Sequence, residues 1–236
     1  MIDTSVRTNE TEIMDDFAME GKRLENALAK IAIINRVLGG NKITVNCVRA
    51  LVKNAPKDKT ISIVDLGCGN GDMLREIAKL GRRLGVKLAL KGIDANAHTI
   101  KHAAILSKGF EEISYECANF LAQVKEAKEY DIILMTLTLH HFSDEEIHQL
   151  LNQLKHQAKL GIVINDLHRS KTAYYLFKTM AALLRLNKMT RADGLTSILR
   201  GFKRKELEAL SSKLKLEHSS IKWKWAYRYQ WVITNL

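Results

Sequence analysis

The residue pattern with the most chemical meaning is Gly67-Cys68-Gly69-Asn70-Gly71-Asp72, in which three glycines at alternate positions are closed by an aspartate. It directly follows Ile61–Leu66, an apolar, β-branched run that predicts a short strand. Glycines let a backbone approach a ligand closely and adopt dihedral angles that other residues avoid. We therefore expect a ligand-binding turn between a strand and a helix N-terminus, with these candidate contacts: Gly67, Cys68, Gly69, Gly71 and Asp72.

The acid at the end of the turn separates two classes of cofactor. A dinucleotide fingerprint, GxGxxG, has a third glycine that admits a pyrophosphate to the helix N-terminus. Asp72 stands at that place, where its charge would repel a pyrophosphate and attract a ligand with amine and sulfonium cations. Taken alone, Asp72 is equally typical of an acid that complements a helix dipole. Within the glycine pattern it favours S-adenosylmethionine over NAD.

A second acid, Asp94, ends the strand-like run Lys87–Asp94, roughly twenty residues after the turn, as expected for a carboxylate that binds a ribose. It can accept hydrogen bonds from both ribose hydroxyls, although a cap for the segment from Asn96 is the alternative. Asn119 is a candidate contact for the adenine edge, and Phe120 for the adenine face. Each of these residues follows a predicted strand, where parallel sheets bind ligands.

Four stretches of the chain, taken in order over residues 61–166, resemble the motif series of class I S-adenosylmethionine-dependent methyltransferases: Val64–Asp72, Asp94, Asn119 and Tyr130–Leu134. The resemblance implies methyltransferase activity and a seven-stranded sheet with an antiparallel last strand. It also implies that Asp65 and the turn glycines contact the methionine part of the cofactor. Two further residues, Ala95 and Met135, join the cofactor site on the same basis.

Two histidine-containing clusters follow later strand-like runs. In the first, His141 is a candidate general base, or else it packs beside the cofactor. In the second, His168 could deprotonate a phenol or an enol with Asp166 as its orienting partner; alternatively, Asp166 and Arg169 pair and fix the loop. Because a sulfonium is an activated donor, holding the acceptor in line and removing its proton supply much of the catalysis.

A small molecule is the acceptor that we expect first. Methyltransferases of base nitrogens or of cytosine carbon 5 usually carry a proline-containing turn after the cofactor motifs, but the single proline, Pro56, precedes the glycine turn. The apolar segment Ala173–Met189 predicts a helix that is part core and part roof of an apolar pocket, and it resembles the cap of quinone and polyketide methyltransferases. Asp193–Phe202 is typical of a loop at a cleft edge, where Arg200 would hold an anionic acceptor. We expect O-methylation of a phenol, quinol or polyketide-like metabolite.

RNA is the alternative acceptor. The chain has a net charge of +11, and basic residues outnumber acids from Arg169 onward. Aromatic residues alternate with basic ones from Trp223 to Trp231. Such a pattern is mostly that of a half-buried strand with a solvated basic face, but it also occurs in proteins that bind single-stranded RNA. A third interpretation is a cofactor-binding protein that has lost its catalytic activity. No motif in the sequence is broken in a way that would support it.

Cysteines and hydropathy limit the remaining classes. Cys47, Cys68 and Cys117 form no CxxC pair, so we expect neither a disulfide framework nor a metal site. No run approaches the ~20 apolar residues of a membrane span, and the first residues lack the pattern of a signal peptide. We therefore expect a cytoplasmic protein with no membrane span.

The elements that must position these residues alternate between strand and helix, which predicts a parallel sheet covered on both faces. The predicted strands are Ile61–Leu66, Lys87–Asp94, Glu112–Cys117, Tyr130–Thr138 and Leu160–Asp166, followed by two antiparallel neighbours, Glu217–Trp225 and Arg228–Thr234. The predicted helices between and after them are Asp72–Leu84, Asn96–Lys108, Phe120–Ala127, Asp144–Gln157, Lys171–Leu186 and Lys203–Leu214. The expected fold class is a doubly wound, Rossmann-like α/β sheet.

The length of 236 residues fits one domain. We expect a helical arm at 1–56, a cofactor-binding core at 57–168, a helical cap at 169–202, and a C-terminal helix and strands at 203–236. The arm should hold a helix over Glu12–Leu38, interrupted near Gly21 and stopped by Gly39-Gly40-Asn41, and a second helix over Val45–Lys53. Its end is similar to a helix that closes over the cofactor in some small-molecule methyltransferases, which would bring Asn35 or Arg36 to the site.

Overall fold

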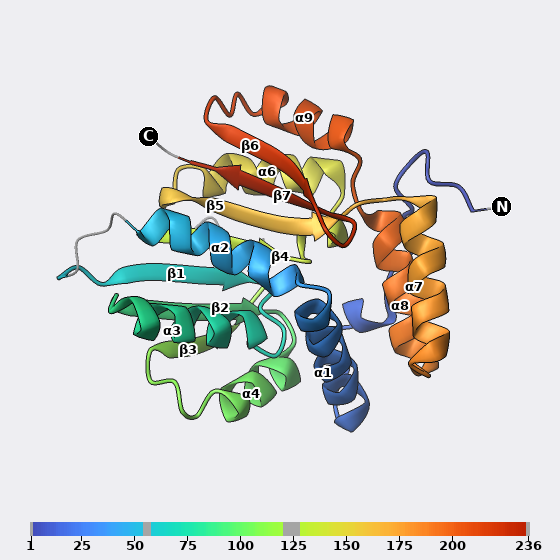
Figure 1. The fold of residues 1–236 in the computed structure, drawn as a ribbon, viewed down its shortest axis with the longest axis horizontal. Helices are drawn as coiled ribbons and strands as arrows, with labels where there is room; N and C mark the ends of the chain where they lie inside the picture. The colour runs from blue at the N-terminus through green and yellow to red at the C-terminus, as the bar shows by residue number, and fades with distance from the viewer. Residues whose placement is uncertain (1, 54–57, 120–127, 235–236) are drawn as a thin grey trace.

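The chain folds around one seven-stranded sheet, shown in Figure 1. The computed structural model describes residues 2–53, 58–119 and 128–234. The strand order is β3-β2-β1-β4-β5-β7-β6; β1 to β5 are parallel, and β7 is antiparallel to both β5 and β6. This order confirms the predicted doubly wound fold with an antiparallel last strand. The strands are β1 (Ile61–Leu66), β2 (Leu88–Asp94), β3 (Ile113–Cys117), β4 (Tyr130–Thr136), β5 (Ala158–Leu167), β6 (Ser219–Lys224) and β7 (Arg228–Ile233).

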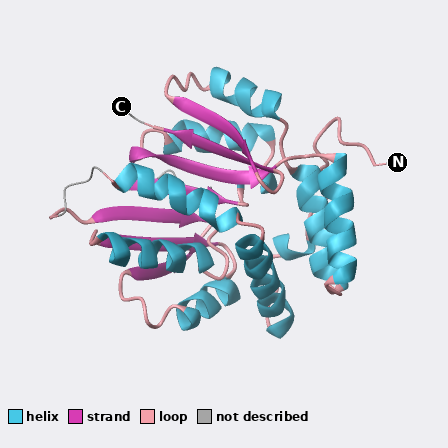
Figure 2. Cartoon of the chain, in the orientation of Figure 1, coloured by secondary structure: helices cyan, strands magenta, loops and turns pink. Residues whose placement is uncertain are grey.

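Helices cover both faces of the sheet (Figure 2). On one face, Val48 of α2 and Leu74 and Ile77 of α3 are buried against the strands; on the other, Leu151 of α6 and Leu207 of α9 are buried. Burying each such side chain contributes about 1.5–3 kcal/mol. The helices are η1 (Ile13–Asp15), α1 (Lys22–Val37), α2 (Gly40–Val52), α3 (Asp72–Leu84), α4 (Ala97–Leu106), η2 (Leu139–His141), α6 (Asp144–Leu154), α7 (Lys171–Leu183), α8 (Lys188–Arg200) and α9 (Arg204–Lys213).

The strand register brings the predicted site residues to one edge of the sheet. Asp65 is level with Gly92 of β2 and with Leu134 of β4, two residues before those strands end. Asn165 of β5 is level with Thr136, the last residue of β4. The carboxyl ends of four parallel strands therefore meet at one edge, on both sides of the point where the strand order reverses between β1 and β4.

The turn after β1 requires glycine at two positions. Gly67 has φ +73° and Gly71 has φ +74°, in the left-handed region. A Cβ atom at Gly71 would lie 1.9 Å from the hydroxyl of Tyr115 on β3, and one at Gly67 would lie 2.6 Å from the side chain of Thr138. The turn is thus packed between β3 and the segment after β4, and it delivers α3 to the sheet edge at Asp72.

Two predictions about the helices were wrong. The second helix was predicted to begin at Val45, but α2 begins at Gly40. Gly39, with φ +76°, separates it from α1 by a single tight turn. The segment predicted as a loop, 193–202, lies mostly within α8. Gly194 stands where α8 meets α7, since a Cβ atom there would lie 2.3 Å from the ring of Phe177. Gly39 forms a left-handed turn between α1 and α2, whereas Gly194 allows α7 and α8 to approach closely. The predicted helix Phe120–Ala127 lies outside the described residues.

The first residues of the chain cross the carboxyl edge of the sheet, and we call residues 2–21 the N-terminal strap. On one side, the backbone amide of Thr8 donates to the Leu199 carbonyl (3.3 Å), and that of Ile13 donates to the Asp193 carboxylate (2.8 Å). On the other side, the Asn96 side chain donates to the carbonyl of Met19 (2.8 Å). The strap therefore connects α8 with the start of α4; its short helix η1 lies between α1 and α8 in Figure 1.

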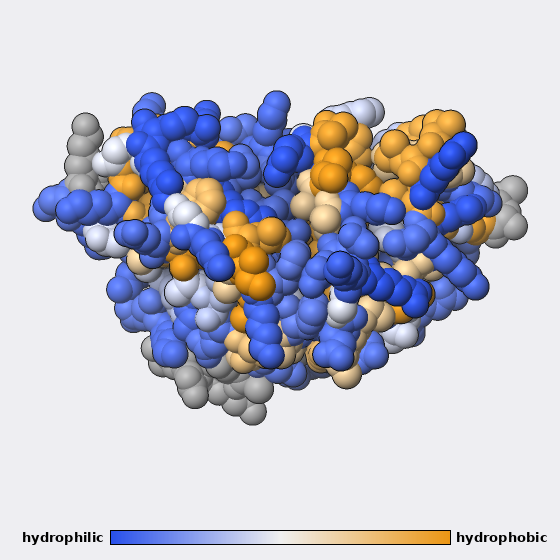
Figure 3. Space-filling model, turned by 90° about the horizontal axis from the view of Figure 1, so that it is seen from below, coloured by the Kyte–Doolittle hydropathy of each residue, from blue (hydrophilic) through white to orange (hydrophobic). Residues whose placement is uncertain are grey.

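The surface is mostly hydrophilic with separate apolar patches (Figure 3). Several exposed apolar side chains belong to α1 and α7, among them Ile33, Val37, Leu176 and Leu183. Helix α7 buries only two alanines completely, so less of it is core than the sequence suggested. Within the described residues, no helix combines the length and apolar character of a membrane span.

Candidate active site

Backbone amides of the glycine turn and of the segment after β2 hold the side chain of Asp94. One carboxylate oxygen of Asp94 accepts a hydrogen bond from the Gly69 amide (3.0 Å), and the other accepts from the Asn96 amide (3.0 Å). Asn96 itself caps α4, because its side chain accepts from the Thr99 amide (2.8 Å). Asp94 is therefore not the cap of α4; it joins the turn after β1 to the turn after β2 and remains partly exposed at the edge.

Three carboxylates gather around this turn. Asp65 is 2% exposed, and its Oδ1 has no hydrogen-bond partner among the described residues. Burial, together with the negative charges of Asp72 and Asp94, raises the pKa of Asp65 well above its ordinary value. Asp72 accepts one hydrogen bond from the Asn41 side chain (2.9 Å). Such a cluster fits a ligand that carries ammonium and sulfonium charges, because a cation would compensate buried negative charge that the neighbouring side chains leave unpaired.

The other predicted cofactor contacts lie in different environments. Cys68 is buried, and its thiol has a raised pKa because of burial and the nearby Asp94 and Asp65 carboxylates. Ala95 is half-buried beside Asp94, and Asn119 is exposed just past the end of β3. Met135 is fully buried in the core, so its side chain does not reach the open edge. Phe120 lies outside the described residues.

A histidine cluster lies at the neighbouring ends of β4 and β5. Nδ1 of His140 is 2.7 Å from Oδ1 of Asp166, and its Nε2 is 3.5 Å from Oε1 of Glu12 in the strap. All three side chains are almost completely buried. Burial alone would lower the pKa of His140, but the carboxylates of Asp166 and Glu12 raise it to about 9. His140 is therefore a buried cation between two acids.

His141 lies beside His140 and is more accessible, with 29% of its side chain exposed. Its Nδ1 is 2.7 Å from Oδ1 of Asp15 in η1, an ion-pair contact that lacks the alignment of a hydrogen bond. Burial opposes ionisation of Asp15, yet His141 and Arg200 lower the pKa of Asp15 to about 2. Burial raises the pKa of Asp94, and the charge of His141 offsets part of that rise. His141 thus lies between the strap and the cofactor edge.

Arg200 organises this cluster rather than facing an open cleft. Its guanidinium donates to the carbonyls of His140 (3.1 Å) and His141, and to the Asp15 carboxylate (2.8 Å). It is 8% exposed. The position predicted for an anionic acceptor is therefore occupied by contacts within the chain.

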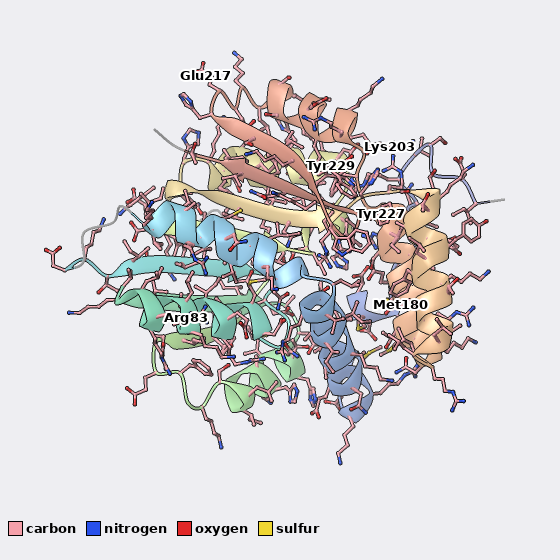
Figure 4. The ribbon with its side chains drawn as sticks, viewed as in Figure 1. Arg83, Met180, Lys203, Glu217, Tyr227 and Tyr229 are labelled. Carbon is pink, nitrogen blue, oxygen red and sulfur yellow. The ribbon has the colours of Figure 1, made fainter. Side chains whose placement is uncertain are left out.

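In the second predicted cluster, Asp166, His168 and Arg169 do not pair with one another. Asp166 pairs with His140 and not with His168, and Arg169 pairs with Glu206 rather than with Asp166. Nδ1 of His168 accepts a hydrogen bond from the indole N–H of Trp223 (3.2 Å). Its ring also stacks on Tyr227, which Figure 4 shows at the tip of the β6–β7 hairpin. Burial lowers the pKa of His168, with help from the charges of Arg169 and Lys203. A neutral imidazole that accepts at Nδ1 carries its proton on Nε2, which disfavours His168 as a base.

Sequence reasoning missed Glu12, Asp15 and His140. Several acids precede Gly21, and nothing in their spacing marks two of them as partners of histidines far along the chain. Of the two arm residues considered for the site, Asn35 is buried and accepts a hydrogen bond from Arg228 (2.7 Å), whereas Arg36 is exposed. Neither contacts the glycine turn through a hydrogen bond in the described part of the chain.

Comparison with known proteins relates this chain to methyltransferases. Residues 63–161 match the family described as a methyltransferase domain. The ribosomal RNA large subunit methyltransferase G of Shewanella denitrificans is 21% identical over 150 residues, which are 62% of this chain. The match spans only 39% of the length of that curated relative.

Solved structures share the fold at low sequence identity. The plantazolicin methyltransferase BpumL, in complex with a monoazolic desmethylPZN analog and SAH, is 20% identical with a TM-score of 0.66, covering 91% of this chain and 90% of its own. The CurJ carbon methyltransferase is 13% identical with a TM-score of 0.62 over 82% of this chain and 53% of its own. Magnesium protoporphyrin IX methyltransferase from Synechocystis PCC 6803, with bound SAH, is 14% identical with a TM-score of 0.55 over 83% and 84%.

Residues 63–161 therefore match a methyltransferase domain, and the chain shares its fold with methyltransferases solved with bound SAH. Its cofactor is S-adenosylmethionine. The turn glycines with Asp65, Asp72 and Asp94 stay the residues predicted to hold that cofactor.

Proposed function

We propose that the chain methylates an oxygen atom of a small, apolar or aromatic acceptor, such as a phenol, quinol or polyketide-like metabolite. The observation that carries this proposal is the close pair of His141 and Asp15 beside the cofactor edge. A carboxylate next to Nδ1 favours the imidazole tautomer with its proton on Nδ1. Nε2 then has a free lone pair and suits the role of general base.

The cofactor supplies a methyl group on a sulfonium, an activated leaving group. His141 would accept at Nε2 the proton of the acceptor hydroxyl, so that no charge accumulates on that oxygen when it receives the methyl group. Asp15 stabilises the imidazolium that results, and Arg200 keeps Asp15 in place through its 2.8 Å contact. Such proton transfer is worth about 10²–10⁴-fold in rate. His168 and Asp166 are not needed in this scheme.

The strap favours a small acceptor over a polymer. Residues 2–21 cross the sheet edge between α8 and α4, directly over the segment that carries His141. A covered, partly buried base excludes water and suits a ligand that can be enclosed. Small-molecule methyltransferases also stand among the structural relatives, a likeness that supports the proposal only through the shared fold.

RNA remains the second candidate, favoured by one observation on the far strand of the sheet. Trp223 and Trp225 are 46% and 64% exposed, and Lys222 and Lys224 alternate with them. Exposed aromatic and basic side chains can stack on bases and contact phosphates. The ribosomal RNA methyltransferase relative agrees with this alternative.

The test is methyl transfer from labelled cofactor into a cell extract, followed by separation of RNA, protein and organic-soluble metabolites. We expect label in the organic-soluble fraction with the unaltered chain and with His168→Gln, and a strong loss with His141→Gln. Label in RNA that disappears with Trp225→Ser would establish the alternative. Label in protein alone would contradict both proposals.

A further inference from the structure

Three buried ligating atoms point to one place beneath the strap. Oε1 of Glu12 lies 3.5 Å from Nε2 of His140 and 3.8 Å from Nδ1 of His141. All three atoms lie within 4.8 Å of one another. None of them makes a hydrogen bond within the described residues. Buried polar atoms without a partner are rare in folded proteins, so three that converge call for a ligand.

We propose that Glu12, His140 and His141 bind a divalent transition metal ion of the zinc class. Zinc binds nitrogen and oxygen ligands at about 2.0–2.2 Å, which separates two ligands of a tetrahedral ion by about 3.4 Å. The distances of 3.5 and 3.8 Å from Glu12 are close to that separation. Two imidazoles with one carboxylate suit zinc, cobalt, nickel or copper, whereas magnesium and calcium prefer oxygen ligands.

Contacts around the three ligands support a metal site. Asp166 lies 2.7 Å from Nδ1 of His140 and keeps a proton on that nitrogen, so Nε2, which is 3.5 Å from Glu12, is the nitrogen that would give up its proton to a metal ion. A carboxylate behind a ligating histidine is the usual outer partner in such sites. Arg200 fixes the backbone of both histidines by donating to their carbonyls. Two of the ligands are thus already oriented without an ion.

The local charge also suits a divalent cation. The imidazoles of His140 and His141 are in contact with three carboxylates, those of Glu12, Asp15 and Asp166. Arg200 compensates only the charge of Asp15 directly. Without an ion, the positive charges of His140 and Arg200 leave one of the three carboxylate charges uncompensated. A divalent ion that displaced the Nε2 proton of His140 would neutralise all three together with Arg200.

The ion would regulate the proposed reaction, and this consequence rests on His141 being its base. Metal at Nδ1 of His141 requires the imidazole proton to sit on Nε2, so the lone pair that accepts the acceptor proton is lost. The ion would also tie Glu12 of the strap to the two histidines of η2. Metal binding is therefore expected to inhibit methyl transfer.

Metal binding is measured first, on the full chain freed of metal by a chelator and without cofactor or acceptor. We expect one equivalent of Zn²⁺ by calorimetry, and visible absorption of tetrahedral Co²⁺ on titration with cobalt. Asp166→Asn should weaken zinc binding by roughly 10–100-fold, the usual effect of removing an outer partner. Glu12→Gln, which keeps the side-chain volume, should weaken it more. His156→Asn, at an exposed histidine after α6, should bind like the unaltered chain.

The outcomes separate this proposal from the proposed function. Zinc binding that is absent, or equal in Glu12→Gln and the unaltered chain, would overturn the site whatever the activity of the chain. Circular dichroism of each variant shows whether it is folded, and Asp166→Asn provides an independent test if Glu12→Gln is not. Stoichiometric binding without inhibition of methyl transfer would retain the site and remove its regulatory role. Inhibition reversed by a chelator, and reduced in Glu12→Gln, is the expected result.

Discussion

The glycine turn and the histidine cluster lie at the same edge of the sheet but are built differently. In the turn, partners are close in the sequence: Gly69 and Asp94 are 25 positions apart and are placed by two adjacent strands. In the cluster, Arg200 and Asp15 are 185 positions apart, and two of the three acids come from a strap that belongs to no strand or long helix. In the proposed function, cofactor binding would therefore depend on the sheet, whereas proton transfer and acceptor choice would depend on segments added to it.

The largest effect should come from the cluster. His141→Gln removes the proposed base, so kcat should fall by about 10²–10⁴-fold while the Kd for the cofactor stays nearly unchanged. Steady-state kinetics with the identified acceptor, and calorimetry with S-adenosylhomocysteine, measure the two quantities. His168→Gln is the matched control and should keep most of its activity. Equal losses in the two variants would make His141 a packing residue.

Stability should also depend on the cluster. Arg200→Met leaves two histidine carbonyls and Asp15 without their buried donor, and should lower the free energy of unfolding by about 2–4 kcal/mol. Arg204→Met removes an exposed pair with Glu208 and should cost at most about 1 kcal/mol. Urea unfolding of both variants makes the comparison. Similar small losses would show that the cluster is not held by Arg200.

In the turn, Asp94→Asn should weaken binding of S-adenosylmethionine by about 10–100-fold, the worth of a charged hydrogen bond. Unfolding should remain cooperative, because the sheet does not depend on this carboxylate. The control is Glu208→Gln, which changes an exposed acid on α9. Unchanged affinity would move ribose recognition away from the end of β2.

The smallest effect should be a change in how steeply the free energy of unfolding depends on pH. The pKa of Asp65 is raised in the folded chain, so folding favours its protonated form, and the free energy of unfolding falls as the pH rises above the ordinary value of 3.8. Asp65→Asn should flatten this fall in urea unfolding. For Asp131, burial raises the pKa, but hydrogen bonds from Ser62 outweigh it and lower the pKa, so ionised Asp131 stabilises the fold and this stabilisation is lost as the pH falls. Asp131→Asn should therefore reduce the loss of stability at low pH, whereas Asp65→Asn reduces the loss at higher pH. Equal slopes in both variants would contradict the buried charge at Asp65.

Most of the sheet could be predicted because apolar strand patterns and glycine turns act locally. The predicted bounds of β1 and α3 match the structure, and the first five strands differ from prediction by at most two residues at an end. The prediction of a loop at 193–202 was wrong because Gly194 was interpreted by its own flexibility. Its function is to let Phe177 of the neighbouring helix approach, a property that only tertiary packing decides.

The site shows the same division. The positions of Asp72 and Asp94 could be predicted because a glycine turn and a strand end fix where each carboxylate lies, whereas the prediction for Asp65 rests on the family resemblance. Asp166 was recognised as an orienting acid but was assigned to His168, its near neighbour in sequence, instead of His140. Asp166 lies near the end of β5 and contacts His140 after β4, whereas His168 lies beyond the end of β5 and contacts the β6–β7 hairpin, so proximity in sequence was a poor guide to the partner. The cofactor contacts and the choice of base stay predictions for the experiments above.

The strap sets the limits for any shortened version of this protein. The carbonyls of Thr4 and Ser5 accept hydrogen bonds from the buried guanidinium of Arg169, so even the first residues of the described chain are fastened to the interior. A version that starts at Lys22 would keep α1, α2 and the acidic turn, so we expect it to bind the cofactor. It would lack both strap acids, Glu12 and Asp15. This single deletion would therefore lower turnover while leaving cofactor affinity nearly unchanged.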